Sequence, residues 1–521
     1  PQPPRMGRCV ALRRRSFGFI LAAILGACLL QWHFLSADVR TPAPARKPTP
    51  NELTRLWLDV VERAGRRPRD RGRILQVAQD IGLGPDVDLA RVVVAHDFAA
   101  CVDRYNLSAP RKMLKLADGP ELRLFTPLET VDHAGRLAAD GDYLQKAPPE
   151  TSGVDFVFLG HHTLERLYDP WLAIAHLYEV MSDGGHVFMQ APLTSLPHKT
   201  SRHYFRFTAM GLAWSLRKAG FEVLEAGEWG SIEYEVTLFA TSRWPGYGVL
   251  TNLNGNPGHV DVVWVLARKP AAPSRLRDLR AASDPLLFSR SPNEYAGVPV
   301  TERLASLWKS VVRPGRLRSR NESAMLQVAD AVGLGRINDF PRIPAVSDFA
   351  EWVDKYDLRS PRKLLRLGDD YELQLLSPHE VLERVYDPST GANDLHRALP
   401  NVSDVDLVVS GQTLEHLHDP FRAVENLFAV MADGGYIFVS TPLVNIPHMA
   451  PSHYFHYTLM GLAWSLSRAG FVVVEAGQWG SRVYEMILFA TMSWPGHGKL
   501  PSIAGDRGHV DQVWVLARKP E

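Results

Sequence analysis

Three histidines and one acid are the residues of this chain best suited to chemistry. Glu415 and His416 are adjacent, and His448 and His453 follow further along the chain. Histidine titrates near neutral pH, so the three histidines are candidate general bases that could take a proton from a hydroxyl group. The same residue types also suit a carboxylate–imidazole metal site, and loop packing without chemistry is a third interpretation. We predict a catalytic role for His416, His448 and His453 and no bound metal.

The elements around these residues predict a strand–helix–strand unit. Asp406–Ser410 is a short β-branched run, typical of a buried strand. Asp419-Pro420 fits the N-cap and first position of a helix, and Gly434-Gly435 fits the turn that ends it. Tyr436–Thr441 is the second strand. Ligands of such parallel sheets bind at the carboxyl ends of the strands, where Gln412–His416 would lie.

This order of loop, helix and double-glycine turn resembles the class I S-adenosylmethionine-dependent methyltransferases, specifically the type 11 group. In that family a Leu-Glu-His loop and an Asp-Pro pair follow the fourth strand, as Leu414–His416 and Asp419-Pro420 do here. The resemblance implies a doubly wound sheet, S-adenosylmethionine as the cofactor and methyl transfer as the reaction. The cofactor-binding residues that it implies are Gly368, Asp387, Asp394, Gln412 and Leu414.

The resemblance also implies roles for individual residues. Gly368 ends the first strand, where glycine lets the backbone approach the cofactor closely. Asp387 matches the acid that holds the ribose, and Asp394 matches the acid on the adenine side. The turn has one glycine where the family usually has two or three, and Arg366 replaces the usual acid. Gln412 stands where metal-using relatives place a further acid.

Length and composition set the broad class. The chain has 521 residues, 45% of them hydrophobic and 22% charged, which is typical of globular protein and predicts two domains. A net charge of +1 gives no general attraction for nucleic acid. The three cysteines are too few and too scattered for a disulfide framework or a cysteine zinc site.

An internal repeat predicts two copies of one domain. His203–Leu216 recurs almost unchanged as His453–Leu466, at an offset of 453 − 203 = 250 residues. We define copy one as residues 51–270 and copy two as residues 301–521, with residues 271–300 as the linker between them. Alternating helices and strands predict an α/β fold with two tandem doubly wound, Rossmann-like domains, which could pack on each other.

The same pattern predicts the other elements of each copy. Each predicted helix or strand is given for copy one and then for copy two. The predicted helices are those around Trp57 and Trp308, those around Leu75 and Leu326, Phe98–Tyr105 and Phe349–Tyr356, and Phe205–Gly220 and Phe455–Gly470. The predicted strands are Lys112–Leu116 and Lys363–Leu367, Phe221–Glu225 and Phe471–Glu475, and Val262–Ala267 and Val513–Ala517. Arginine clusters at Arg63–Arg73 and Arg313–Arg320 are typical of solvated helix-end loops.

The two copies differ at the residues that the resemblance singles out. Copy one has Ala117 at the position of Gly368 and Arg166 at the position of His416. The side chain of an alanine narrows the turn, and an arginine at the cavity mouth would repel a cationic cofactor. Asp140 or Asp142 would be the equivalent of Asp394. We therefore predict that only copy two binds the cofactor.

The N-terminus predicts a membrane anchor. Residues 1–15 are rich in arginine, residues 16–37 carry no charge and could span a bilayer as a helix, and residues 38–50 form a proline-rich linker. This pattern predicts a single-pass type II membrane protein with residues 1–15 in the cytosol and the rest on the lumenal side of the endoplasmic reticulum or Golgi. A cleaved signal peptide and an organellar transit peptide are the alternatives.

Two functions from different classes fit these observations. The first is a membrane-anchored S-adenosylmethionine-dependent methyltransferase acting on a small-molecule, glycan or lipid acceptor. The second is a catalytically inactive, duplicated methyltransferase-like protein that serves as a binding module or scaffold. The Leu-Glu-His loop of copy two favours the first, and the loss of glycines from the turn in both copies favours the second.

Overall fold

The computed structural model describes most of the chain beyond the predicted anchor. The described residues are 52–521 apart from 67–68, 117–118, 135–141, 161–162, 197–201, 251–252, 272–298, 335–339, 369–370, 384–394, 397–398, 400, 497–499 and 501. The predicted tail, membrane segment and first linker, residues 1–50, lie outside them. Among the helices of the described residues, none combines the length and the apolar character needed to cross a bilayer.

Copy one alternates helices and strands. Its elements are α2 (Glu52–Asp59), η1 (Val61–Arg66), α3 (Arg71–Asp80), α4 (Leu89–Arg104), β1 (Lys112–Lys115), η2 (Pro120–Leu124), β2 (Glu129–Asp132), α6 (Tyr143–Lys146), β3 (Val154–Leu159), η3 (Leu164–Arg166), α7 (Pro170–Val180), β4 (Met181–Pro192), β5 (Phe205–Phe207), α8 (Ala209–Lys218), β6 (Glu222–Trp229), α9 (Ile232–Thr241) and β7 (Val262–Arg268).

Copy two repeats the same order. Its elements are α11 (Val300–Leu307), the π-helix η6 (Trp308–Val312), α12 (Arg313–Arg316), α13 (Glu322–Ala331), α14 (Arg342–Lys355), β8 (Lys363–Arg366), η8 (Tyr371–Leu375), β9 (Glu380–Glu383), β10 (Val405–Gly411), η9 (Leu414–His416), α15 (Pro420–Val430), β11 (Met431–Pro442), β12 (Phe455–Tyr457), α16 (Leu459–Ala469), β13 (Val472–Trp479), α17 (Arg482–Thr491) and β14 (Gln512–Arg518).

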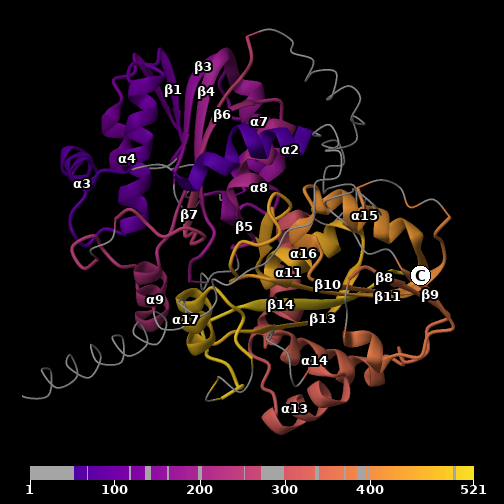
Figure 1. Cartoon of the computed structure of the whole chain (residues 1–521). Helices are drawn as coiled ribbons and strands as arrows, with labels where there is room; N and C mark the ends of the chain where they lie inside the picture. The colour runs from indigo at the N-terminus through magenta and orange to yellow at the C-terminus, as the bar shows by residue number, and fades with distance from the viewer. Residues whose placement is uncertain are drawn as a thin grey trace, which may run out of the picture.

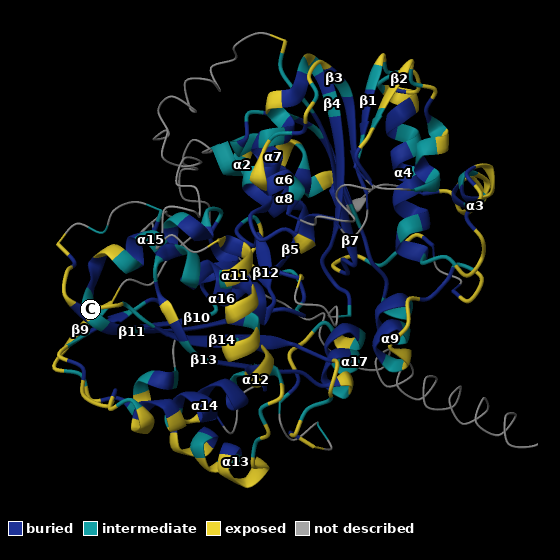
Figure 2. Ribbon diagram, turned by 180° about the vertical axis from the view of Figure 1, so that it is seen from behind, coloured by how far each residue is buried: buried dark blue, intermediate teal, exposed yellow. Residues whose placement is uncertain are grey.

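Each copy builds one six-stranded sheet with helices on both faces (Figure 1). The strand order is β2-β1-β3-β4-β7-β6 in copy one and β9-β8-β10-β11-β14-β13 in copy two. All neighbouring strands are parallel except β7 and β14, which run antiparallel to both of their neighbours. These two strands are buried along almost their whole length (Figure 2). The prediction of two doubly wound α/β sheets is therefore confirmed.

The strand–helix–strand unit of copy two forms as its sequence predicts. The Asp419 carboxylate accepts a hydrogen bond from the backbone N–H of Arg422, and Pro420 occupies the first turn of α15. Strand β11 begins at Met431, earlier than the predicted Tyr436, because Met431 already pairs with Val405 of β10 before a register shift. The βαβ unit therefore brings the ends of β10 and β11 side by side.

Two predictions about secondary structure were wrong. Residues 205–207 and 455–457 form the short strands β5 and β12, not the first turns of the helices predicted there. Each of these strands pairs with the other copy, a partner that the local helical spacing does not show. Helices α9 and α17 were not predicted. They begin at Ser231 and Ser481, whose hydroxyls accept hydrogen bonds from the backbone three residues on.

The composition of the arginine clusters suggested solvated loops, but at least one arginine of each cluster pairs with a buried acid. In copy two Arg320 binds the buried Asp348 at 2.7 Å, and Trp514 donates its indole N–H to the same carboxylate. In copy one Arg69 and Asp97 make the matching ion pair at 2.7 Å. A buried ion pair of this kind must be complete, since removing one partner leaves an uncompensated charge. The repeat thus preserves one charged network that fastens the arginine segment to the sheet.

The two copies join along a seam, which we define as the contact between β5 with the start of α8 and β12 with the start of α16. Strands β5 and β12 pair antiparallel. The Thr208 backbone N–H donates to the Tyr454 carbonyl at 3.1 Å, and Thr458 donates to the Tyr204 carbonyl at 3.0 Å. Each helix therefore begins by bonding the backbone of the other copy, so the seam has approximate two-fold symmetry.

Glycine is required at this seam. A Cβ atom on Gly461 would lie 1.9 Å from the Tyr204 carbonyl oxygen, and one on Gly211 would lie 2.0 Å from the Tyr454 carbonyl oxygen. Both contacts are far shorter than van der Waals separation. The repeated Met-Gly-Leu-Ala-Trp segment therefore records the close approach of two backbones.

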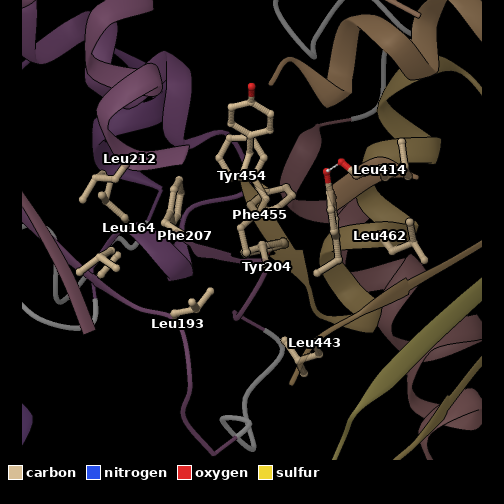
Figure 3. Packing of buried hydrophobic residues seen from close by; sticks show 14 of the residues in the cluster. Leu164, Leu193, Tyr204, Phe207, Leu212, Leu414, Leu443, Tyr454, Phe455 and Leu462 are labelled. Atoms are coloured by element: carbon tan, nitrogen blue, oxygen red, sulfur yellow. Dashed lines mark hydrogen bonds between the residues drawn. The ribbon is translucent and has the colours of Figure 1, made fainter. Parts of the chain in front are cut away.

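Apolar side chains from both copies fill the space around the seam (Figure 3). Trp171 of copy one packs edge-on against Phe421 and Phe455 of copy two, with ring centroids 4.8 and 5.3 Å apart. Lys218 of copy one binds Asp419 of copy two at 2.6 Å. The two copies contact each other here, and their buried apolar residues form one continuous core.

The seam yields a test of stability. We expect Gly461→Ala to lower the free energy of unfolding by about 3 kcal/mol, the upper part of the range for overpacking, because backbone must move to admit the methyl group. The matched control is Gly84→Ala, since a Cβ there meets no atom within 4 Å. Urea unfolding of the full chain measures both variants. Equal stability of the two would contradict the close approach.

Candidate functional site

A cavity of about 380 Å³ opens at the carboxyl ends of β8, β10 and β11 in copy two. This is the edge of a parallel sheet where ligands bind in doubly wound folds. Its volume falls within the range of about 300–1,000 Å³ typical of small-molecule sites. The lining residues are Pro341, Arg342, Leu367, Gly368, Gly411, Gln412, Thr413, His416, Pro442, Val444, Asn445, His448, Met449, Tyr484, Trp494, Asp511 and Gln512.

The loop after β10 contains a residue in a left-handed backbone conformation, which the sequence pattern does not predict. Gln412 has a φ of +52°, a left-handed conformation that non-glycine residues adopt rarely. Its N–H donates to the Ser440 carbonyl on β11 at 2.9 Å, which holds the turn in place. Strained backbone of this kind is concentrated at binding sites. The turn directs the following η9 segment across the end of the sheet.

The cavity brings together four of the predicted site residues. Gly368, Gln412, His416 and His448 all line it. Gly368 also accepts a hydrogen bond at its carbonyl from the Arg366 side chain at 2.7 Å. The residue that replaces the family's usual acid is thus used to hold the turn.

The other predicted site residues lie elsewhere. Leu414 is buried in the core beside the seam, and its carbonyl accepts a hydrogen bond from the Tyr457 hydroxyl at 3.2 Å (Figure 3). Its side chain is therefore a packing residue, not part of the cavity wall. His453 is buried behind His448, with ring centroids 4.4 Å apart. Asp387 and Asp394 lie outside the described residues, so their cofactor roles stay predictions.

Backbone carbonyls orient the cavity histidines. The His416 Nδ1 lies 2.6 Å from the Ser452 carbonyl oxygen, and the His448 Nδ1 lies 3.0 Å from that of Ile446. A carbonyl can only accept, so Nδ1 carries the proton in each ring and Nε2 keeps its lone pair. His453 accepts a hydrogen bond at Nδ1 from the backbone N–H of His448. It therefore positions His448 from behind.

Burial controls the charges of this group. Desolvation raises the pKa of the Glu415 carboxyl to about 7 and lowers the pKa of the His416 imidazole. Burial also lowers the pKa of His453 well below its usual value, and the neighbouring His456 adds to the effect. The lowered pKa values of His416 and His453 favour the neutral imidazole, the form in which a lone pair can accept a proton or bind a metal.

Several lining residues could not be identified from sequence. Asp511 and Gln512 reach the cavity because β14 pairs with the end of β11, where Pro442 lies opposite Gln512. Trp494 donates its indole N–H to Asn445 at 2.9 Å and covers one side. Burial, together with the nearby Glu485, raises the pKa of the Asp511 carboxyl well above its usual value. The only sequence signal was the repeat itself, which matches Asp261 to Asp511.

Copy one has a cavity of about 480 Å³ of a different character. Its lining includes Phe158 and Gly160 at the end of β3 and the ion pair that Arg91 makes with Glu121 through two hydrogen bonds of 2.7 and 2.9 Å. Arg166 is exposed and is not among the residues that line it. Because residues 161–162 of the same loop lie outside the described residues, the position of Arg166 at the cavity mouth stays a prediction. Ala117 lies outside the described residues.

The cavity of copy two fits the implied cofactor in chemical terms. Within the described residues, Gln412 Nε2, Gln512 Nε2 and Asp511 Oδ1 are buried polar atoms without a hydrogen-bond partner. Such atoms are costly unless a ligand or water satisfies them. S-adenosylmethionine carries ribose hydroxyls, an amino group and a carboxylate, which can pair with amides and acids of this kind.

Part of copy two is similar to a known protein family. The family model described as a methyltransferase domain matches residues 348–476. No curated protein sequence matches the chain.

Solved methyltransferases resemble the chain only weakly. Haemonchus contortus phosphoethanolamine N-methyltransferase 2, solved with S-adenosylhomocysteine, is 12% identical, covers 82% of this chain and 99% of its own, and has a TM-score of 0.23. The N-methyltransferase NodS of Bradyrhizobium japonicum is also 12% identical, covers 39% of this chain and all of its own, and has a TM-score of 0.24. Similarity at this level does not identify a substrate or a partner.

The match to the methyltransferase family model begins within α14 and ends within β13. It therefore spans the first strand, the Leu-Glu-His loop and the strand–helix–strand unit of copy two. It supports S-adenosylmethionine as the cofactor. Residues 348–476 are therefore similar to methyltransferase domains, and their fold is class I methyltransferase-like.

Proposed function

We propose that copy two is an S-adenosylmethionine-dependent methyltransferase and that copy one supports it structurally. The observation that carries the proposal is the cavity at the carboxyl ends of β8, β10 and β11, which places Gly368 and Gln412 beside two histidines. The cavity also offers polar atoms that the protein leaves unsatisfied among its described residues. The position of this cavity, its volume and its polar lining all support one ligand site.

The chain's own residues divide into a cofactor side and an acceptor side. Gly368 and Gly411 leave the backbone accessible, and Arg342 offers positive charge to a carboxylate. Gln412, Asp511 and Gln512 supply the remaining polar contacts. When bound, S-adenosylmethionine supplies an electrophilic methyl group. Catalysis then depends mainly on holding the acceptor in line with that group.

His416 and His448 are placed to assist the acceptor. Each presents Nε2 while its Nδ1 is held by a carbonyl. A hydroxyl acceptor must lose a proton, and a neutral imidazole at hydrogen-bond distance can receive it. His453 acts by positioning His448. The acceptor we propose is a small molecule, a glycan or a lipid headgroup, with no role for nucleic acid.

Copy one gives a reason to keep the scaffold alternative. The Arg91–Glu121 ion pair lines its cavity, and Ala117 replaces the turn glycine. These features favour a structural role for copy one. If copy two also fails to bind the cofactor, the whole chain is a scaffold.

Titration with S-adenosylhomocysteine tests the proposal on the full chain. We expect one molecule to bind per chain, measured by calorimetry. Gly368→Leu should weaken binding at least about tenfold, because overpacking a close contact costs about 1–3 kcal/mol. The matched control is Ala117→Leu in copy one, which should leave binding unchanged.

Two outcomes would contradict this assignment. If the wild-type chain binds no S-adenosylhomocysteine, the methyltransferase proposal fails and the scaffold alternative replaces it. If Ala117→Leu weakens binding and Gly368→Leu does not, the site is in copy one. Circular dichroism of each variant shows whether it remains folded.

We further propose that residues 16–37 anchor the protein in a membrane of the endoplasmic reticulum or Golgi with both copies in the lumen. The support is the arginine-rich segment before an uncharged stretch. Asn106, Asn321 and Asn401, each the first residue of a glycosylation sequon, are all exposed. Protease treatment of intact vesicles should leave both copies undigested until detergent is added. Digestion of copy two without detergent would contradict this topology.

A further inference from the structure

Three metal-ligating side chains converge beside the cavity of copy two. They are Glu415, His416 and His448, and their potential ligand atoms all lie within 4.8 Å of one another. Two of them follow β10 on η9, and His448 lies on the loop after β11. The sheet edge therefore gathers ligands from two separate loops at one point.

The two imidazoles are oriented as metal ligands usually are. Each donates its Nδ1–H to a backbone carbonyl, that of Ser452 or Ile446, so that Nε2 is the nitrogen with a lone pair. Histidines that bind metals almost always make such a second hydrogen bond, which fixes the tautomer and the ring orientation. Both rings also line the cavity, so an ion between them would be reached from it.

Glu415 supplies an acceptor that has no other evident use. The residue is 0% exposed, and its Oε2 accepts a hydrogen bond from the Thr441 hydroxyl at 3.1 Å. Its Oε1 lies 4.0 Å from His416 Nε2 and has no hydrogen-bond partner among the described residues. A buried carboxylate oxygen without a partner is costly, and a cation beside it would remove that cost.

We propose that Glu415, His416 and His448 bind a divalent transition-metal ion, with Zn²⁺ as the best fit, and leave a coordination position open to the cavity. Two imidazoles and one carboxylate are typical of catalytic zinc sites, which keep one position for water or substrate. Magnesium and calcium prefer oxygen ligands throughout. A small movement of the side chains would bring the ligand atoms to bonding distance.

Neighbouring groups shape the site without acting as ligands. The His453 Nδ1 lone pair is already occupied by the His448 N–H, so His453 supports a ligand and does not compete with it. Arg342 lines the same cavity, and its charge opposes a second cation. The negative charge of the Glu415 carboxylate offsets that repulsion for an ion bound beside it.

Copy one lacks the same set of ligands. Glu165 is kept at the position of Glu415 and is buried, whereas Arg166 replaces His416 and is exposed. An arginine cannot bind a metal because it keeps its proton. The chain should therefore bind one ion, in copy two.

The proposed ion would refine the acceptor side of the reaction. An oxygen ligand on a divalent ion loses its proton more readily, so the open position suits an acceptor oxygen. This acceptor role rests on the proposed methyltransferase function, but metal binding does not. His416 and His448 would then act as ligands and not as free bases.

Zinc binding by the full chain tests the inference without any methylation assay. The protein is treated with a chelator, dialysed and titrated with Zn²⁺ in competition with a chromophoric chelator. We expect one ion per chain. Glu415→Gln and His448→Ala should each weaken binding about 100-fold or more, since even outer-shell changes cost about 10–100-fold. His379→Ala is the matched control, because His379 is exposed and remote from the cavity lining.

A second readout separates a specific site from surface binding. Co²⁺ added to the stripped protein should give the visible absorption of a low-coordinate site, and both ligand variants should lose it. No Zn²⁺ bound, or binding unaffected by Glu415→Gln and His448→Ala, would overturn the inference. S-adenosylhomocysteine is titrated separately into the stripped protein, so loss of metal binding and loss of cofactor binding are distinguishable outcomes.

Discussion

The rest of this structure depends on two helices that begin against each other's backbone. The N-cap residues of α8 and α16, Thr208 and Thr458, donate to carbonyls of the opposite copy. Gly211 and Gly461 leave no room for a side chain between the two backbones. The contact reaches the functional loop directly. Tyr454, next to β12, donates its N–H to the Glu415 carbonyl at 2.8 Å, and Tyr457 donates its hydroxyl to the Leu414 carbonyl. Copy one holds β12, and β12 holds the Leu-Glu-His loop.

The duplicated halves have diverged at matching positions in a way that suits these roles. Arg206 and His456 pair across the seam. Arg206 is fully buried and donates to the carbonyls of Leu193 and Ser195 in copy one and of Leu443 in copy two. A charged side chain surrounded by carbonyls binds the halves together, whereas His456 lies 2.9 Å from His453, behind the cavity. At this matching position, copy one therefore has an arginine that bonds to both copies, and copy two has a histidine next to His453.

Local patterns in the sequence predicted what depends on local structure. Strand β10, helix α15 and the cavity positions of Gly368 and Gln412 follow from turn residues, helical spacing and the resemblance. The contacts between copies could not be predicted in this way. Residues 205–207 read as helix because their strand partner is about 250 residues away, and Asp511 reaches the cavity only through the antiparallel pairing of β14 with β11. The sequence shows that Arg166 stands where copy two has His416, but the direction of the Arg166 side chain depends on the tertiary fold.

We propose one cofactor site, in copy two, on a loop that the seam supports. Hydrogen–deuterium exchange of the full chain, with and without saturating S-adenosylhomocysteine, tests both whether the ligand binds and where it binds. Bound ligand slows exchange where it buries or orders amides. We expect protection in residues 366–368, 411–416 and 442–449, with residues 158–166 of copy one unchanged. Protection confined to copy one, or none anywhere at saturating ligand, would contradict it.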